Sequence, residues 1–268
     1  MVKKASFLFL VGLMFYGCAT VPLTGRKQLS LVSNSEILPL SYDQYKQVLK
    51  ESKLSDNKEW TAMVKRAGKN IQLAAERFMR QQNALDQLEG YEWEFNLIDS
   101  ETVNAWCMPG GKVAFYTGIM PICKTEEGVA VVMGHEVAHA LANHGRERMS
   151  QGLVTNLGLS SVSLAMGQNP TLTQEIFMQS VGVGTQLGML KFSRTHESEA
   201  DKIGLIFMAM AGYNPEEAPR FWQRMEAQSG GERPPEFMST HPSPGTRIRD
   251  LNANMPEALE YYRKSKGS

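Results

Sequence analysis

The sequence of 268 residues predicts an α+β fold that is mostly helical, with a small antiparallel β-sheet beside one central apolar helix. Three observations predict this fold. Apolar residues recur at helical spacing over Asp56–Gln82 and again over Val129–His144. Between these helices, Tyr91–Asp99 alternates well enough to be a strand. A strong turn signal, Pro109-Gly110-Gly111, then lies between two further strand-like stretches.

The turn predicts a β-hairpin made of Val103–Met108 and Lys112–Tyr116. An exposed edge of such a sheet can bind an extended peptide by strand addition. The candidate for that edge is Asn104, Ala105 and Trp106. The alternative is an ordinary core strand in which Trp106 is buried.

The N-terminus has the composition of an export signal. A basic start precedes the apolar run Ala5–Phe15, which ends at the small residues Gly17-Cys18-Ala19. The run is too short to cross a bilayer of about 30 Å, so residues 1–17 are predicted to be a secretory signal peptide. The Gly17-Cys18 junction resembles a bacterial lipoprotein signal, in which Cys18 carries the lipid, although two aromatic residues before Gly17 depart from the usual pattern. The alternative is an ordinary cleaved signal, and either signal places the protein outside the cytoplasm.

Charge and cysteine content narrow the function classes. Lys plus Arg and Asp plus Glu both total 28, which gives no support to nucleic-acid binding or to electrostatic membrane attachment. If Cys18 is acylated, Cys107 and Cys123 remain in an oxidising compartment. They form either a disulfide or two buried free thiols, and neither belongs to a C-x-x-C zinc pair.

The remaining stretches predict a linker followed by one domain. Residues 18–33 are expected to be an extended linker and residues 34–268 a single domain that opens with a helix from Ser35 to about Lys50. The region 146–190 predicts a helical hairpin broken at Asn169-Pro170, either packed on the core or acting as a lid.

Farther along, the helix that follows Phe192 should end at Ala211-Gly212, and Asn214-Pro215 should start another. A short helix holding Arg247 and a last helix over about Pro256–Arg263 complete the expected fold.

An H-E-x-x-H motif, His135-Glu136-Val137-Ala138-His139, lies inside the apolar helix 129–144. His135 and His139 are one turn apart and project from the same face, so both neutral imidazoles can bind one Zn²⁺. Glu136 points to the side of the metal, where it can take a proton from a bound water. Burying these groups in an apolar helix is costly unless they are paired or metal-bound, which disfavours a helix that merely carries two histidines.

A catalytic zinc usually has three protein ligands and an open fourth position. His139 is followed by Ala-Leu-Ala-Asn-His, so the third ligand must come from another helix. Glu197 and Asp201 lie one turn apart on one helical face, whereas Glu199 points away from it. One acid can bind zinc while the other holds a ligating histidine by its free N–H. The alternative is an acidic helix face exposed to solvent. However, the residues that continue the same face along the helix are apolar, which indicates that the face is buried.

These motifs resemble the gluzincin metallopeptidase family that contains the CaaX prenyl endopeptidases, the HtpX-like proteases and the Oma-type protease, with most likeness to exported, lipoprotein-like bacterial members. The matching residues are His135-Glu136-Val137-Ala138-His139, Glu197-Ser198-Glu199-Ala200-Asp201, and Thr240-His241-Pro242 with Arg247. The resemblance implies a zincin-like catalytic domain with Glu197 as third ligand and Asp201 as the structural acid. It also implies misfolded or damaged envelope proteins as substrates.

His241 is framed by Pro242 and Pro244, which place it on a rigid loop. It could donate to the tetrahedral oxyanion, occupy the open zinc position at rest, or be a turn histidine that bonds backbone. His144 and His196 are expected to be structural or surface residues.

The sequence therefore predicts an endopeptidase with one Zn²⁺ per chain, on the periplasmic side of a bacterial envelope and anchored to the outer membrane through Cys18. Zinc activates water, and Glu136 takes a proton from it and returns the proton to the leaving amine. The rival hypothesis is a non-catalytic chaperone or assembly factor that keeps zinc for structure. The intact Glu136 argues against it, since a purely structural site needs no base.

Overall fold

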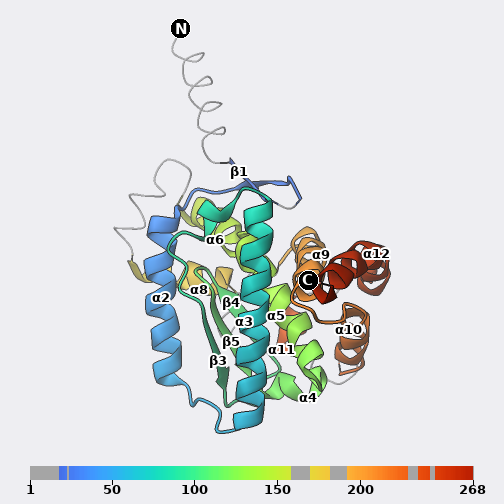
Figure 1. Cartoon of the computed structure of the whole chain (residues 1–268). Helices are drawn as coiled ribbons and strands as arrows, with labels where there is room; N and C mark the ends of the chain where they lie inside the picture. Colours follow the sequence, from blue (N-terminus) through green and yellow to red (C-terminus); the bar gives the residue numbers. More distant parts are fainter. Residues whose placement is uncertain are drawn as a thin grey trace.

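The computed structural model describes residues 18–22, 24–157, 170–181, 192–228, 235–241 and 245–267 (Figure 1). The predicted signal peptide, the two prolines after His241 and parts of the 146–190 region lie outside the described residues. Whether that region acts as a lid stays a prediction.

The stretch 18–33 differs from an extended linker, because it contains two paired strands. Strand β1 (Cys18–Thr20) pairs antiparallel with β2 (Lys27–Leu29), at the top of the view in Figure 1. The loop between them is closed by the Val21 N–H, which donates to the Arg26 carbonyl at 2.9 Å. Val21 is buried in the main core, so an apolar side chain fastens this hairpin to the domain.

Two long helices follow, α2 (Asn34–Glu51) and α3 (Lys58–Gln81). Helix α2 is capped at Ser33, two residues earlier than predicted, because Ser33 and Glu36 form a capping box. Helix α3 is capped by Asn57, whose side chain accepts the Trp60 N–H at 3.0 Å. Its predicted apolar stripe is buried against α5 and the sheet, as expected for a core-packing helix.

After the 3₁₀ turn η1 (Leu85–Leu88), the chain forms strands β3 (Glu94–Ile98), β4 (Ala105–Met108) and β5 (Lys112–Tyr116). In the described chain, the strand order is β3-β5-β4. The predicted β4–β5 hairpin is confirmed, but the sheet is mixed, because β5 runs parallel to β3. The connection after β3 carries the chain past one strand position before it turns back. The hairpin therefore places β5, not β4, beside β3.

The central helix is α5 (Glu126–Leu141), which follows the short elements η2 (Thr117–Ile119) and α4 (Met120–Cys123). All its residues from Gly128 to Leu141 are buried. The predicted helix 129–144 is split, because Asn143 adopts φ 59° and a new helix, α6 (His144–Leu157), begins after it. This break turns His144 back toward α5.

The second half of the chain is helical: α8 (Pro170–Ser180), α9 (Arg194–Met210), α10 (Glu217–Gln228), α11 (Glu236–Thr240) and α12 (Arg247–Lys266). Helix α9 packs against both α5 and α12, and α6 packs against α8. The two predicted C-terminal helices are one helix that includes Pro256. No helix in the described ranges is both long and apolar enough to cross a membrane.

The disulfide alternative is not realised in the structure. Cys107 in β4 and Cys123 at the end of α4 are both buried free thiols. Cys107 lies beside Glu136, whereas the Cys123 carbonyl accepts a hydrogen bond from Arg224 at 3.4 Å. Burial raises the pKa of both thiols, as expected for inert core cysteines.

Candidate metal centre

Helices α5 and α9 cross at two glycines, and this contact creates the site. A Cβ built on Gly134 would lie 2.8 Å from the Gly204 carbonyl oxygen, and one on Gly204 would lie 2.8 Å from Gly134 carbon. Any larger residue at either position would push the two helices apart. The close approach brings His135 and His139 of α5 next to Glu197 of α9.

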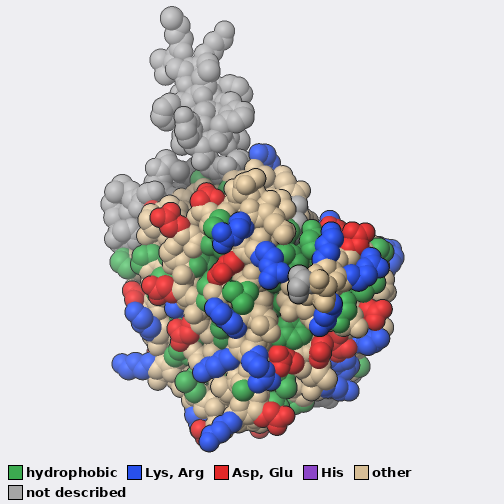
Figure 2. All heavy atoms as spheres, viewed as in Figure 1, with side chains coloured by type: hydrophobic (Ala, Val, Ile, Leu, Met, Phe, Trp, Pro, Cys, Tyr) green, Lys and Arg blue, Asp and Glu red, His purple; other side chains and the backbone are tan. Residues whose placement is uncertain are grey.

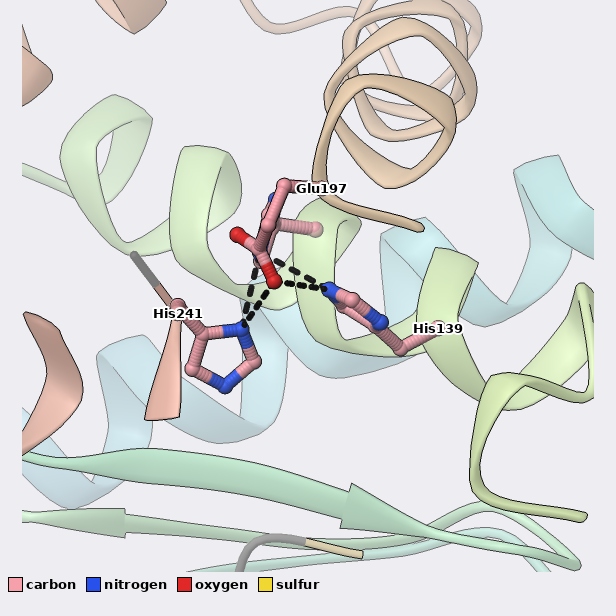
Figure 3. Close-up of side chains that lie close together, drawn as sticks. His139, Glu197 and His241 are labelled. Carbon is pink, nitrogen blue, oxygen red and sulfur yellow. Dashed lines mark hydrogen bonds and ion pairs between the residues drawn. The ribbon is translucent and has the colours of Figure 1, made fainter. Parts of the chain in front are cut away.

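Four ligand atoms converge between these helices and the end of α11: His135 Nε2, His139 Nε2, Glu197 Oε1 and His241 Nδ1. Figure 3 shows three of these side chains, those of His139, Glu197 and His241, pointing toward one another. The two ligand nitrogens of His135 and His139 are 3.1 Å apart. Glu197 Oε1 lies 3.4 Å from His139 Nε2 and 3.1 Å from His241 Nδ1. His241 Nδ1 lies 3.3 Å from His135 Nε2. All four side chains are buried.

These spacings fit a tetrahedral metal ion. Four ligands at about 2.0–2.1 Å from a central Zn²⁺ stand about 3.3 Å from each other. The opposite ring nitrogens of His135 and His139 face other partners, so two nitrogen lone pairs converge at 3.1 Å. Such an arrangement repels unless a cation lies between the nitrogens. The residues present therefore fit the metal that the motif predicts.

A second set of contacts holds the ligands in place. His135 Nδ1 lies 2.9 Å from Asp201 Oδ1, within reach for the ring N–H to donate to this carboxylate. Arg247 donates to Asp201 Oδ2 at 2.7 Å and also to Glu197, and its guanidinium stacks over Trp222 at 3.8 Å. Sequence reasoning assigned Asp201 and Arg247 to this supporting role, and the structure brings both to the ligands.

The charges around Glu197 favour its ionised form. Burial alone would raise the pKa of Glu197, but the three facing histidines outweigh it and hold the pKa well below its ordinary value. Burial also lowers the pKa of Arg247, but Asp201 and Glu197 reverse that effect, so its pKa is raised. A carboxylate and a guanidinium are thus both charged in the protein interior, where each is stabilised by its pairing with the other.

Glu136 lies beside the four-atom cluster without joining it. Its side chain is buried, and its Oε1 has no hydrogen-bond partner within the described ranges. His241 Nε2 is 3.6 Å from this oxygen. Burial raises the pKa of Glu136, and the nearby His241 and His135 offset only part of this increase. A carboxylate with one free oxygen among the described residues and a raised pKa, beside a metal cluster, is suited to accept a proton.

The predicted edge Asn104, Ala105 and Trp106 lies at the start of β4, which is an outer strand of the described sheet. The Tyr116 N–H donates to the Asn104 carbonyl at 3.1 Å. In an antiparallel ladder this pairing directs the backbone groups of Ala105 and Cys107 away from β5. These outward groups are engaged in part, because the Ala105 N–H donates to Asn104 Oδ1 at 2.9 Å and the Cys107 backbone interacts with Glu136. Trp106 itself is buried and packs edge-on against Tyr45, so only the backbone of this strand can be an interaction surface.

Sequence reasoning missed a polar cluster behind His139. His144 and His196 were expected to be structural or surface residues, and both are buried. His144 Nδ1 lies 2.9 Å from His139 Nδ1, and its Nε2 lies 2.8 Å from Glu199. Burial lowers the pKa of His144 to about 4, although Glu199 opposes that effect. His144 follows His139 by five residues, a spacing that does not place two side chains on one face of a continuous helix. The break at Asn143 brings the two rings together, and helical spacing does not reveal that break.

Figure 2 agrees with this burial, since no histidine shows on the described surface of the face that it displays. Lysine and arginine are interspersed there with aspartate and glutamate.

Comparison with known proteins places this geometry in a family. A family model described as Peptidase family M48 matches residues 65–255. The chain is 33% identical over 242 residues to the mitochondrial metalloendopeptidase OMA1 of Schizosaccharomyces pombe, which covers 89% of this chain and 66% of that protein. It is 28% identical to human OMA1, with 97% of this chain and 52% of the human protein covered.

A bacterial relative is the β-barrel assembly-enhancing protease of Escherichia coli, which is 31% identical over 59% of this chain and 33% of its own length. The chain thus spans from about a third to two thirds of these three relatives. The family match covers well over half of the chain and contains both α5 and α9, whose side chains converge at the site. The chain therefore belongs to peptidase family M48.

Proposed function

We propose that this chain is a zinc-dependent endopeptidase. The observation that carries the proposal is the convergence of His135, His139 and Glu197 at tetrahedral spacing, with Glu136 beside them, whose Oε1 has no hydrogen-bond partner among the described residues. His135, His139 and Glu197 would hold the metal. When bound, zinc polarises a carbonyl oxygen and lowers the pKa of water.

The protein's own residues do the rest of the chemistry. Glu136 accepts a proton at Oε1 and returns it to the leaving amine, so it acts first as base and then as acid. Asp201 keeps the His135 ring in the tautomer whose Nε2 is free to bind, and Arg247 keeps Glu197 ionised. His241 completes the four-atom cluster at rest, so substrate must displace it or share the site with it.

The edge of β4 supports an extended polypeptide as substrate. Backbone groups that face away from β5 can pair with a peptide strand, and this edge brings the peptide next to Glu136. A hollow beside Glu136 and His139 is lined mainly by apolar residues, Ile37, Leu38, Tyr91, Val181 and Phe192 among them. The hollow has a volume of about 10 Å³, so it would have to widen before an apolar substrate side chain could enter.

We also propose that the protein works on the periplasmic side of a bacterial envelope, anchored through a lipid on Cys18, on misfolded or damaged envelope proteins. The predicted export signal and the likeness to a bacterial protease named for β-barrel assembly support this setting. Two other relatives are named as mitochondrial, which makes the setting the first point to test. Labelling with radioactive palmitate should mark the wild type but not Cys18→Ser, and labelling of both would refute the anchor.

Casein hydrolysis tests the activity. The purified protein should cleave casein, lose activity with a chelator and regain it with zinc. A zinc-loaded protein that leaves casein and unfolded envelope proteins intact would favour the non-catalytic chaperone instead.

A further inference from the structure

The N-terminal hairpin inserts one arginine between two buried acids of the domain. Arg26 donates from Nε to Glu199 at 2.7 Å and from Nη1 to Glu147 at 2.9 Å. The Thr24 hydroxyl also donates to Glu199. The Glu199 side chain is 4% exposed and that of Glu147 is 10% exposed, so Arg26 supplies charge to two carboxylates that water scarcely reaches.

Each acid is joined to a histidine on its inner side. His144 Nε2 lies 2.8 Å from Glu199, and His196 Nε2 lies 3.0 Å from Glu147. The two imidazoles stack with centroids 4.4 Å apart. Arg26, two acids and two histidines thus form one continuous polar cluster.

The cluster ends on a metal ligand, and proton positions follow from that. If His139 offers Nε2 to the metal, its proton must be on Nδ1, which faces His144 Nδ1 at 2.9 Å. His144 then accepts at Nδ1 and carries its own proton on Nε2, which donates to Glu199. A single assignment of ring protons satisfies every hydrogen bond from His139 through His144 to Glu199. In that assignment Glu199 only accepts, so it must be ionised.

We propose that Arg26 is a positioning residue of the metal centre, acting on His139 through Glu199 and His144. The N-terminal hairpin is then part of the site, although it precedes the nearest metal ligand by more than 100 residues. Removing Arg26 leaves Glu199 without its cation and frees its carboxylate to rotate away from His144. This inference rests on metal binding at the proposed centre but not on peptidase activity.

Zinc affinity, measured by competition with a chromophoric chelator at neutral pH, tests the inference. Loss of an outer partner of a ligand histidine costs about 10–100-fold in metal affinity. Arg26→Ala should weaken zinc binding about tenfold, and Arg26→Lys should weaken it less, because lysine can pair with one acid but cannot bridge both. Lys27→Ala is the matched control and should leave zinc affinity unchanged, since among the described residues the Lys27 ammonium donates to the exposed Thr20 hydroxyl and not to the cluster.

A double variant separates positioning from general stability. If Arg26 acts through Glu199, then Arg26→Ala with Glu199→Gln should bind zinc no more weakly than Glu199→Gln alone. The visible absorption of the Co²⁺-substituted protein should also change in Arg26→Ala, because the ligand geometry is disturbed, and should not change in Lys27→Ala. Melting temperatures of the metal-free proteins report any loss of fold. If Arg26→Ala does not fold, Arg26→Lys carries the same comparison.

The inference is wrong if Arg26→Ala, or Arg26→Lys in its place, binds zinc as tightly as the wild type. It is equally wrong if the losses of Arg26→Ala and Glu199→Gln add. A wild type that binds no zinc would instead refute the metal centre itself, and with it this role of Arg26.

Discussion

Replacing Glu136 by glutamine removes a proton acceptor while leaving the size and shape of the side chain. The carboxylate is buried, one oxygen has no partner among the described residues, and burial raises its pKa. A carboxylate with a raised pKa is a better proton acceptor, and general acid–base catalysis contributes about 10²–10⁴-fold. Because Glu136 is expected to move the proton twice, we expect kcat/KM to fall by about 10³–10⁴, equivalent to about 4–5 kcal/mol of barrier.

The assay is hydrolysis of a fluorogenic peptide, with zinc content measured on the same samples. Glu136→Gln should keep its zinc, because none of the converging ligand atoms belongs to this residue. Glu127→Gln, an exposed change in the first turn of the same helix, should retain full activity. The wild-type rate should fall as the pH drops below the raised pKa of Glu136, since only the carboxylate accepts a proton. Glu136→Gln should lack that acid limb.

Two results would refute this assignment. Activity of Glu136→Gln within tenfold of the wild type would show that another group takes the proton. Loss of zinc in proportion to loss of activity would show that Glu136 supports the metal rather than the reaction.

Three further predictions follow from the same cluster. His241→Ala should keep zinc, since three ligands remain. It should also raise kcat on a short peptide, because the imidazole no longer occupies the fourth position. A fall in kcat of about 10²–10³-fold would instead identify His241 as an oxyanion donor. Arg247→Leu should lower the free energy of unfolding of the metal-free protein by about 3–5 kcal/mol in urea, because Glu197 and Asp201 lose the buried guanidinium that they share. A loss below about 1 kcal/mol would contradict the pairing. Burial opposes ionisation of Glu199, but its partners lower its pKa to about 2, so its contribution to stability is present above the ordinary glutamate pKa and is lost as the pH falls toward 2. The free energy of unfolding of the metal-free wild type should therefore drop by about 1 kcal/mol more between pH 5 and pH 3 than that of Glu199→Gln, and equal drops would count against the ion pair.

The elements that the sequence predicted best are those defined by neighbouring residues. Helical periodicity located α3 and α5, and the Pro109-Gly110-Gly111 turn located the hairpin, because both signals depend on residues close in the chain. The one-turn spacing of His135 and His139 is likewise a local property of a helix. Features that need distant partners were predicted less well. The parallel pairing of β3 with β5 and the short break at Asn143 are two examples.

By itself, the sequence determined that two histidines share one face of an apolar helix, that Glu136 stands beside them, and that an acidic helix must supply the remaining ligand. Only the tertiary structure decided which side chains meet them. Contact between Gly134 and Gly204 sets the distance from α5 to α9, and this distance brings Glu197 within 3.4 Å of His139. The docking of residues 18–29 brings Arg26 to Glu199, two positions that no local pattern connects. The physical reason is that periodicity fixes the direction of a side chain on its own element, whereas a site depends on how closely separate elements pack.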